Sequence, residues 1–254
     1  GDEFDGVVLY HRWLAWAGDI GYELLLKLNR HYNRARQKLG LPYWSISAHI
    51  KKKVKNAVAF IGKFEEAVAE AARLRGEGAE VQAVACDISD LAQVTAAFDA
   101  HVAAYGGLDI CFANAGWDAG DGFWAPSGER NPLGRIDQYD PEKWKRSIDI
   151  NLSGAYYTIR EAVRCMRAGN RKGSIIATAS NAGIINEPIV GIPYMPAKAG
   201  VLHLVRHAAL ELAEFGIRVN AIAPGPFVTN IGDGWVKKNP DARTSFEKTI
   251  PIGR

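Results

Sequence analysis

Residues 81–116 read VQAVACDISDLAQVTAAFDAHVAAYGGLDICFANAG and change twice between two kinds of pattern. The short apolar runs Val81–Cys86 and Leu108–Ala113 predict strands that are buried on both faces. Between them, Asp90–Tyr105 has the apolar spacing of a helix, with an aspartate at its start and Gly106-Gly107 as its stop. A strand, a helix and another strand in this order are typical of a parallel sheet.

The same alternation continues on both sides of this stretch and is not divided by a linker, a repeat or a low-complexity tract. We therefore expect residues 1–254 to form a single α/β domain, with a doubly wound, Rossmann-like parallel sheet in a three-layer α/β/α arrangement. A loop rich in glycine, tryptophan and proline is expected from Trp117 to Gln138. The other predicted strands are Gly6–Tyr10, Asn56–Ile61, Ser174–Thr178 and Arg218–Ala223, and the other predicted helices are Tyr22–Leu39, Phe64–Arg75, Pro141–Ala168 and Tyr194–Phe215.

The composition is that of an ordinary globular protein. Of the 254 residues, 48% are hydrophobic and 23% are charged, and the net charge of +3 is too small to indicate a nucleic-acid partner. No apolar run reaches the roughly 18 residues that span a bilayer, and no signal-peptide pattern opens the chain. The scattered Cys86, Cys111 and Cys165 indicate buried thiols rather than a disulfide or a metal site. We expect a cytoplasmic protein with no membrane partner.

Tyr194-Met195-Pro196-Ala197-Lys198 places a phenol and an ammonium one helical turn apart. A free phenol has a pKa of about 10, and a nearby cation lowers it enough for general acid/base work. Tyr139 and Lys143 have the same spacing. However, Asp140-Pro141 resembles an N-cap followed by a first-turn proline, so Tyr139 is expected before the helix rather than on it.

Small or polar residues follow several of the predicted strands: Asp87, Asn114-Ala115-Gly116, Ser180, and Pro224-Gly225 with Thr229. Ligands of doubly wound sheets bind outside the carboxyl ends of the strands. Each of these residues alone could form a cap or a turn. Their arrival at one edge of the sheet, next to the helix that carries Tyr194 and Lys198, favours a binding site.

Taken together, these motifs resemble the short-chain dehydrogenase/reductase family over the chain from about residue 56 onward. The resemblance implies an NAD(P)-dependent oxidoreductase that interconverts a secondary alcohol and a ketone by hydride transfer, assembled as a homotetramer or dimer. The matching stretches are Asn114-Ala115-Gly116, Asn151 within Ile150–Gly154, Ser180 within Gly173–Gly183, Tyr194 with Lys198, Arg218-Val219-Asn220, and Pro224-Gly225 with Thr229.

The resemblance also implies a role for each residue. Tyr194 would exchange a proton with the substrate oxygen, Ser180 would hydrogen-bond that oxygen, and Lys198 would lower the pKa of the tyrosine and hold the nicotinamide ribose. Asn151 would hold helix backbone and a proton-relaying water. Cofactor contacts are implied for Asp19, Ile20, Gly21, Asp87, Ile88, Asn114, Ala115, Gly116, Tyr194, Lys198, Pro224, Gly225, Phe227 and Thr229.

Residues 10–55 are atypical for the family. Leu14, Ala15 and Asp19 hold places of the phosphate-binding loop where glycine or threonine is expected, and two tryptophans lie where backbone must approach a pyrophosphate. Ile61-Gly62-Lys63, at the end of the predicted second strand, has no acid for a ribose 2′-hydroxyl and offers a lysine for a 2′-phosphate. This favours NADP over NAD as the cofactor. The family's last helix and strand are expected to be missing after Arg254, or to be cut from the recorded sequence.

Several alternatives stay open at this point. The aromatic residues Trp117, Phe123 and Trp124, with Phe227 and Trp235, would form an apolar lid over a small-molecule substrate or pack on their own loop. The damaged phosphate loop favours a catalytically weak relative that serves as a binding or regulatory module. The basic cluster Lys51–Lys55 is typical of a solvated helix face, with a nucleic-acid or membrane role as the less favoured alternative.

Overall fold

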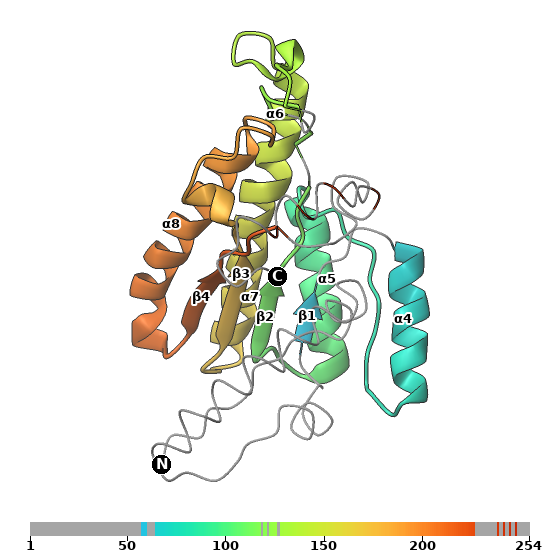
Figure 1. The fold of residues 1–254 in the computed structure, drawn as a ribbon. Coiled ribbons are helices and arrows are strands. Elements are labelled where there is room, and N and C mark those ends of the chain that lie inside the picture. The colour runs from blue at the N-terminus through green and yellow to red at the C-terminus, as the bar shows by residue number, and fades with distance from the viewer. Residues whose placement is uncertain are drawn as a thin grey trace, which may run out of the picture.

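The computed structural model of the protein describes residues 57–59, 64–117, 119–120, 122–125 and 128–226, together with the single positions 238, 241, 244 and 247. At its centre is a four-stranded parallel sheet in the order β1-β2-β3-β4 (Figure 1). The strands are β1 (Ala57–Ala59), β2 (Ile110–Ala113), β3 (Ser174–Thr178) and β4 (Arg218–Ile222). The helices are α4 (Phe64–Gly76), α5 (Leu91–Tyr105), α6 (Pro141–Ile148), α7 (Gly154–Ala168) and α8 (Tyr194–Leu212). The predicted α/β class with a parallel sheet is confirmed; that residues 1–254 form one domain stays a prediction.

The apolar run Val81–Cys86 does not form a strand, so that prediction was wrong. A strand requires a neighbour for its ladder hydrogen bonds, and this run makes none with the described residues. It is held instead by side chains: Arg75 donates its Nε–H to the Val81 carbonyl (3.0 Å), and Gln82 donates to the Ala100 carbonyl (3.3 Å). An apolar composition therefore did not suffice to add this segment to the sheet.

The predicted strand Asn56–Ile61 is present as the shorter β1, but its place in the sheet differs from the expected one. In the usual doubly wound order 3-2-1-4-5-6, the second strand does not touch the fourth. Here Ala57 pairs with Ile110 and Ala59 pairs with Phe112 of β2, which is the fourth predicted strand. Strand β1 therefore holds the place that the first strand takes in that order. The argument for NADP assumed that this segment is the second strand, and Ile61–Lys63 themselves lie outside the described residues.

Three helices cover one face of the sheet. Helix α7 packs against β2 and β3 and between α5 and α8, while α8 also packs against β4. Alternate strand residues such as Ile175, Ala177 and Val219 are buried in this layer together with Phe98 and Met166. Fully burying a large apolar side chain stabilises a fold by about 1.5–3 kcal/mol. Figure 1 shows α4 beyond α5, on the side of the sheet where β1 runs.

The helix boundaries follow the capping signals of the sequence. Asp90 accepts hydrogen bonds from the backbone N–H groups of Ala92 and Gln93 at the start of α5, and Gly106 ends that helix in a left-handed conformation with φ of 77°. Asp140 caps α6 in the same way, by accepting from the Glu142 N–H (2.9 Å). Tyr139 therefore precedes α6, as predicted.

The predicted helix Pro141–Ala168 is interrupted. Helix α6 ends at Ile148, a π-helical turn occupies Asp149–Ser153, and α7 begins at Gly154. Such turns close wider i→i+5 hydrogen bonds and occur frequently at functional sites. Here the Gly154 N–H donates to the Asp149 carbonyl, which spans five residues.

The thiols of all three cysteines are free. Cys111 and Cys165 are buried as predicted, and Cys86 is half-buried, where burial raises the pKa of its thiol to about 11. Among the described residues, no group of three or more His, Cys, Asp or Glu side chains is placed to hold a metal ion. No helix in the described ranges is long and apolar enough to cross a membrane.

His101 is a buried polar side chain whose Nε2 has no hydrogen-bond partner among the described residues. Burial lowers the pKa of His101, and this effect exceeds the opposing hydrogen bond to Gly107. A histidine pKa that is lower in the folded than in the unfolded chain makes stability fall as the pH drops below about 6.5.

We predict that the free energy of unfolding of the wild type falls more steeply below pH 6.5 than that of His101→Phe, by up to about 1.4 kcal/mol per pH unit. Urea unfolding at pH 7.5 and pH 5.5 measures this difference. The exposed His203 supplies the control, because His203→Phe should keep the wild-type pH dependence. Equal slopes for wild type and His101→Phe would contradict the prediction.

Candidate active site

The carboxyl ends of β2 and β3 are joined by Thr178, the last residue of β3. Its hydroxyl donates to the Asn114 Oδ1 just after β2 (2.8 Å), and its carbonyl accepts a hydrogen bond from the Lys198 Nζ on α8 (3.0 Å). One threonine thus ties two strand ends and a helix together at the edge of the sheet where ligands bind in doubly wound folds.

Lys198 is a buried cation. Its residue is 3% exposed, and desolvation lowers the pKa of its ammonium to about 8. The Nζ lies 5.5 Å from the centroid of the Tyr194 ring, one turn earlier on α8, so the two groups are neighbours as the spacing predicts. A lysine on a helix ordinarily keeps its ammonium in water. A buried ammonium such as this one therefore needs polar neighbours that stabilise its charge.

Gly116 lies against the same lysine. A Cβ on this residue would lie 3.1 Å from the Asn151 Oδ1 and 3.4 Å from the Lys198 Nζ. The absence of a side chain therefore lets the backbone after β2 approach both groups closely. Asn151, Lys198 and the backbone at residue 116 together form one wall of the site.

Asn151 holds the segment that follows Gly116. It is buried in the π-helical turn, where its Oδ1 accepts the Trp117 N–H (3.0 Å) and its Nδ2 donates to the Trp117 carbonyl (2.9 Å) and to the Ser147 Oγ (3.2 Å). A carboxamide has both a donor and an acceptor, so one side chain satisfies both backbone groups of Trp117.

Ser180 lies two residues after the end of β3. Its Oγ accepts the Ala182 N–H (3.1 Å) and donates to the Asn181 Oδ1 (3.3 Å). The Asn181 N–H donates to the Pro224 carbonyl (2.9 Å), which places the turn after β4 next to the turn after β3. A Cβ on Gly183 would lie 2.8 Å from the Lys198 carbonyl carbon, so this turn also packs directly on α8.

The structure brings Asn114, Gly116, Asn151, Tyr194 and Lys198 together through these contacts. Ala115 and Ser180 adjoin them, while no heavy atom of the described residues lies within 4 Å of the Cβ position of Gly225. Ile88 is buried against Gly154, and Asp87 accepts hydrogen bonds from the Ser89 N–H (2.9 Å) and Oγ (2.7 Å), as a turn cap does. The predicted residues Asp19, Ile20, Gly21, Phe227 and Thr229 lie outside the described part of the chain, as does the basic cluster Lys51–Lys55.

Known proteins share sequence and fold with this chain. The model of a family described as enoyl-(acyl carrier protein) reductase matches residues 45–254. The 3β-hydroxysteroid dehydrogenase 1 of Eggerthella lenta is 37% identical over 199 residues, which are 78% of this chain and 70% of that protein.

The chain belongs to the short-chain dehydrogenase/reductase family.

Other members show the same relationship at lower coverage or identity. Sorbose reductase of Candida albicans is 32% identical over 180 residues, which are 70% of this chain but only 58% of that protein, less than two thirds. Among solved structures, levodione reductase matches with a TM-score of 0.66 at 27% identity, covering 82% of this chain and 77% of that chain. NAD+-bound xylitol dehydrogenase matches with a TM-score of 0.63 at 26% identity, covering 81% of each chain.

In this short-chain dehydrogenase/reductase, the loop after Trp117 is fastened to the segment between Ser180 and Tyr194. A Cβ on Gly122 would lie 2.2 Å from the Pro188 carbonyl oxygen, so the two backbones touch there and require glycine. The backbone hydrogen bonds are Gly122 N–H to Ile189 O (3.0 Å), Trp124 N–H to Pro188 O (3.1 Å) and Gly191 N–H to Gly120 O (2.7 Å).

The aromatic residues of this loop contact arginines. Arg130 lies over the rings of Phe123 (5.5 Å) and Trp124 (4.4 Å), and Arg146 lies over Trp117 (4.8 Å). For Phe123 and Trp124 this favours the alternative of packing within the loop. Phe227 and Trp235, the other members of the expected lid, are outside the described residues.

Four residues at or beside this edge of the sheet were not predicted: Thr178, Trp117 through its backbone, Asn181, and Glu187, whose carboxylate accepts a hydrogen bond from the Asn181 Nδ2 (3.2 Å). Thr178 had a signal, because a hydroxyl at the end of an apolar strand indicates a polar environment. The other three follow from tertiary contacts between segments far apart in the sequence, which no local pattern encodes.

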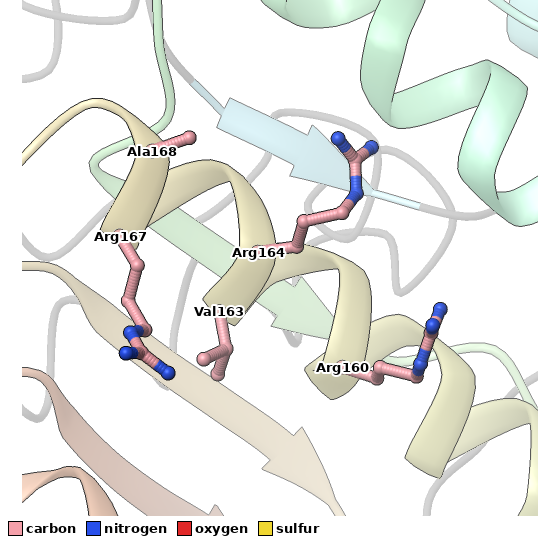
Figure 2. A pocket seen from close by; sticks show the side chains of 5 residues that line it. All are labelled: Arg160, Val163, Arg164, Arg167 and Ala168. Atoms are coloured by element: carbon pink, nitrogen blue, oxygen red, sulfur yellow. The ribbon is translucent and has the colours of Figure 1, made fainter.

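A separate concavity lies on α7 and contains none of these residues. Figure 2 shows Arg160, Arg164 and Arg167 spread along the helix with strands behind it. Arg160 and Arg164 pair with the buried Glu161, Arg164 also pairs with Asp99 (2.5 Å), and Arg167 lies over the Phe215 ring (4.1 Å). Because Glu161 and Asp99 neutralise much of this positive charge, the concavity has little free charge with which to bind a ligand. We therefore keep the strand ends as the candidate active site.

We predict that Lys198→Met stabilises the ligand-free protein at pH 7 by about 2 kcal/mol. Holding the ammonium pKa at about 8 rather than 10.5 costs about 3 kcal/mol, while losing the bond to the Thr178 carbonyl costs about 1 kcal/mol. Since the cost disappears as the pH rises from 8 toward 10.5, the gain should shrink at pH 10. Urea unfolding at both pH values measures it, with the exposed Lys172→Met as control. A destabilised Lys198→Met variant would contradict the prediction.

We predict that Asn151→Ala lowers the free energy of unfolding by about 2–4 kcal/mol, because the N–H and carbonyl of Trp117 both lose their partner. Chemical denaturation measures the loss. Asn186→Ala, at an exposed position six residues after Ser180, should change stability by less than about 0.5 kcal/mol. If the two variants were equally stable, Asn151 would not hold this segment.

Proposed function

We propose that the protein is an NAD(P)-dependent oxidoreductase that interconverts a secondary alcohol and a ketone by hydride transfer. The observation that carries this proposal is the buried Lys198 ammonium beside the Tyr194 ring at the carboxyl edge of a parallel sheet. Family membership supports it, as do relatives named as a sorbose reductase, a hydroxysteroid dehydrogenase and a galactitol 2-dehydrogenase. These names cover sugars, polyols and steroids, which share an alcohol or a ketone.

The residues at this edge fit a nicotinamide cofactor, which when bound would supply or accept the hydride. Lys198 has three N–H donors, and the Thr178 carbonyl uses one of them, which leaves two for the hydroxyls of a ribose. The bare backbone at Gly116 lets a ligand approach beside that ammonium. We infer that Asn114–Gly116, Asp87 with Ile88, and Pro224 line the cofactor groove, with Asp19–Gly21, Phe227 and Thr229 as further contacts. We propose NADP or NAD as the cofactor, because β1 lies beside β2 and the preference for NADP that we drew from Ile61–Lys63 no longer applies.

In ketone reduction, we assign Tyr194 as the general acid that donates its phenolic proton to the substrate oxygen. Its conjugate phenolate is stabilised by the Lys198 ammonium, whose pKa of about 8 leaves it charged at neutral pH. On substrate binding, Ser180 would turn its one hydroxyl proton from the Asn181 Oδ1 to the same oxygen, where negative charge develops. Asn151 positions the backbone after Gly116, and the Thr178 carbonyl holds the ammonium. In alcohol oxidation each proton moves in the reverse direction.

A catalytically weak relative that only binds ligands is the competing proposal, and cofactor binding tests both. Titration with NADH and with NADPH, followed by nicotinamide fluorescence, should give saturable binding of at least one. Absence of saturable binding of both would remove the oxidoreductase proposal. We also propose a homodimer or homotetramer, which the molar mass from light scattering would test.

We predict that Tyr194→Phe lowers the turnover rate by a factor of about 10² to 10⁴ while cofactor affinity stays within about threefold. The variant lacks the phenolic hydroxyl that donates the proton but keeps the ring. Steady-state kinetics and the fluorescence titration measure the two quantities. Tyr156→Phe, at an exposed tyrosine on α7, is the matched control and should retain wild-type turnover. Loss of cofactor affinity in Tyr194→Phe would mean that this tyrosine has a different role.

A further inference from the structure

The segment between Ser180 and Tyr194 carries one charged residue, Glu187. The segment begins after Ser180 and ends before Tyr194, the two residues to which we assign catalytic roles. Its second half is fastened by the backbone hydrogen bonds to residues 120–124 described above. The Glu187 N–H donates to the Met195 Sδ (3.3 Å), and Met195 directly follows Tyr194 on α8. The backbone of Glu187 is therefore fastened to the start of α8, the helix that carries Tyr194.

A chain of hydrogen bonds connects the carboxylate to the serine. Ser180 Oγ donates to the Asn181 Oδ1 (3.3 Å), and the Asn181 Nδ2 donates to the Glu187 Oε1 (3.2 Å). Only one amide separates the carboxylate from the hydroxyl that we assign to the substrate oxygen. A group bound to Glu187 would thus lie next to the reacting carbon rather than at a distant part of a substrate.

The Glu187 carboxylate has unused acceptor capacity. A carboxylate accepts about four hydrogen bonds, and among the described residues only Asn181 donates to this one. No lysine or arginine in the described ranges forms an ion pair with Glu187. The residue is half-buried, so an apolar substrate that covered it would leave a desolvated charge without partners.

These contacts favour a ligand that donates hydrogen bonds. An ammonium group would also satisfy the carboxylate, but it would add a second positive charge to a site that already holds the buried Lys198 cation. A neutral hydroxyl carries no such penalty. We propose that Glu187 is a specificity-determining residue that selects substrates with a hydroxyl on the carbon adjacent to the reacting carbon, that is, vicinal diols and α-hydroxyketones. This inference rests on the proposed oxidoreductase function and assigns a substrate class to it.

The test compares ketones that differ only in that hydroxyl: 3-hydroxybutan-2-one against butan-2-one, and 2-hydroxycyclohexanone against cyclohexanone. The wild type should reduce each hydroxyketone with a kcat/KM at least about tenfold higher than its partner. Glu187→Gln should lower kcat/KM for the hydroxyketones by about ten- to a hundredfold, because a hydrogen bond to a charged acceptor is lost. For the plain ketones the change should stay within about threefold, and the exposed Glu214→Gln is the matched control.

Different outcomes would contradict the role of Glu187 and the proposed oxidoreductase function. An equal fall of kcat for all four ketones in Glu187→Gln would overturn the inference, because Glu187 would then act only through Asn181 and Ser180. A wild type that reduces both members of each pair equally well would overturn it too, while the oxidoreductase proposal would stand. If the wild type reduces none of the four with either cofactor and binds neither cofactor, both proposals fail together.

Discussion

The buried ammonium group of Lys198 is the constraint on which the arrangement of the candidate active site depends. The Lys198 ammonium is desolvated, and its neighbours in place of water are the Thr178 carbonyl, the ring of Tyr194 and the backbone at Gly116. Removing a cation from water is expensive unless it is paired, so every element that contacts it must be held in place. Strand β3 supplies the acceptor, the segment after β2 supplies the space, and the start of α8 carries both Tyr194 and Lys198.

The loops near the site are fixed by backbone contacts. The segment after Trp117 and the segment before Tyr194 exchange main-chain hydrogen bonds, and Gly122 allows them to touch. Main-chain bonding of this kind does not depend on side-chain identity, so a site wall can vary in chemistry while its path is kept. Glu187 and the aromatic residues of the first loop are side chains displayed on this fixed path.

Much of this arrangement could be predicted because its signals are local. The capping residues Asp90 and Asp140 set helix starts, and the four-residue spacing placed Lys198 beside Tyr194. The failures concern pairing. Val81–Cys86 has the composition of a strand without a ladder partner among the described residues, and β1 lies beside β2 because of contacts far along the chain. The bond from Lys198 to the Thr178 carbonyl also joins distant segments, so spacing alone could not reveal it.

The π-helical turn at Asp149–Ser153 has a consequence for how this long helical region tolerates change in length. Each residue of an α-helix advances about 100° around the axis, so one additional residue resets the angular phase of everything downstream. The turn keeps Asn151 aimed at the backbone of Trp117 while the buried stripe of α7 still faces the sheet. If one residue of Asp149–Ser153 were deleted, either Asn151 would lose its contact with Trp117 or the buried stripe of α7 would turn away from the sheet. The same deletion at the exposed end of α7 would leave both contacts in place.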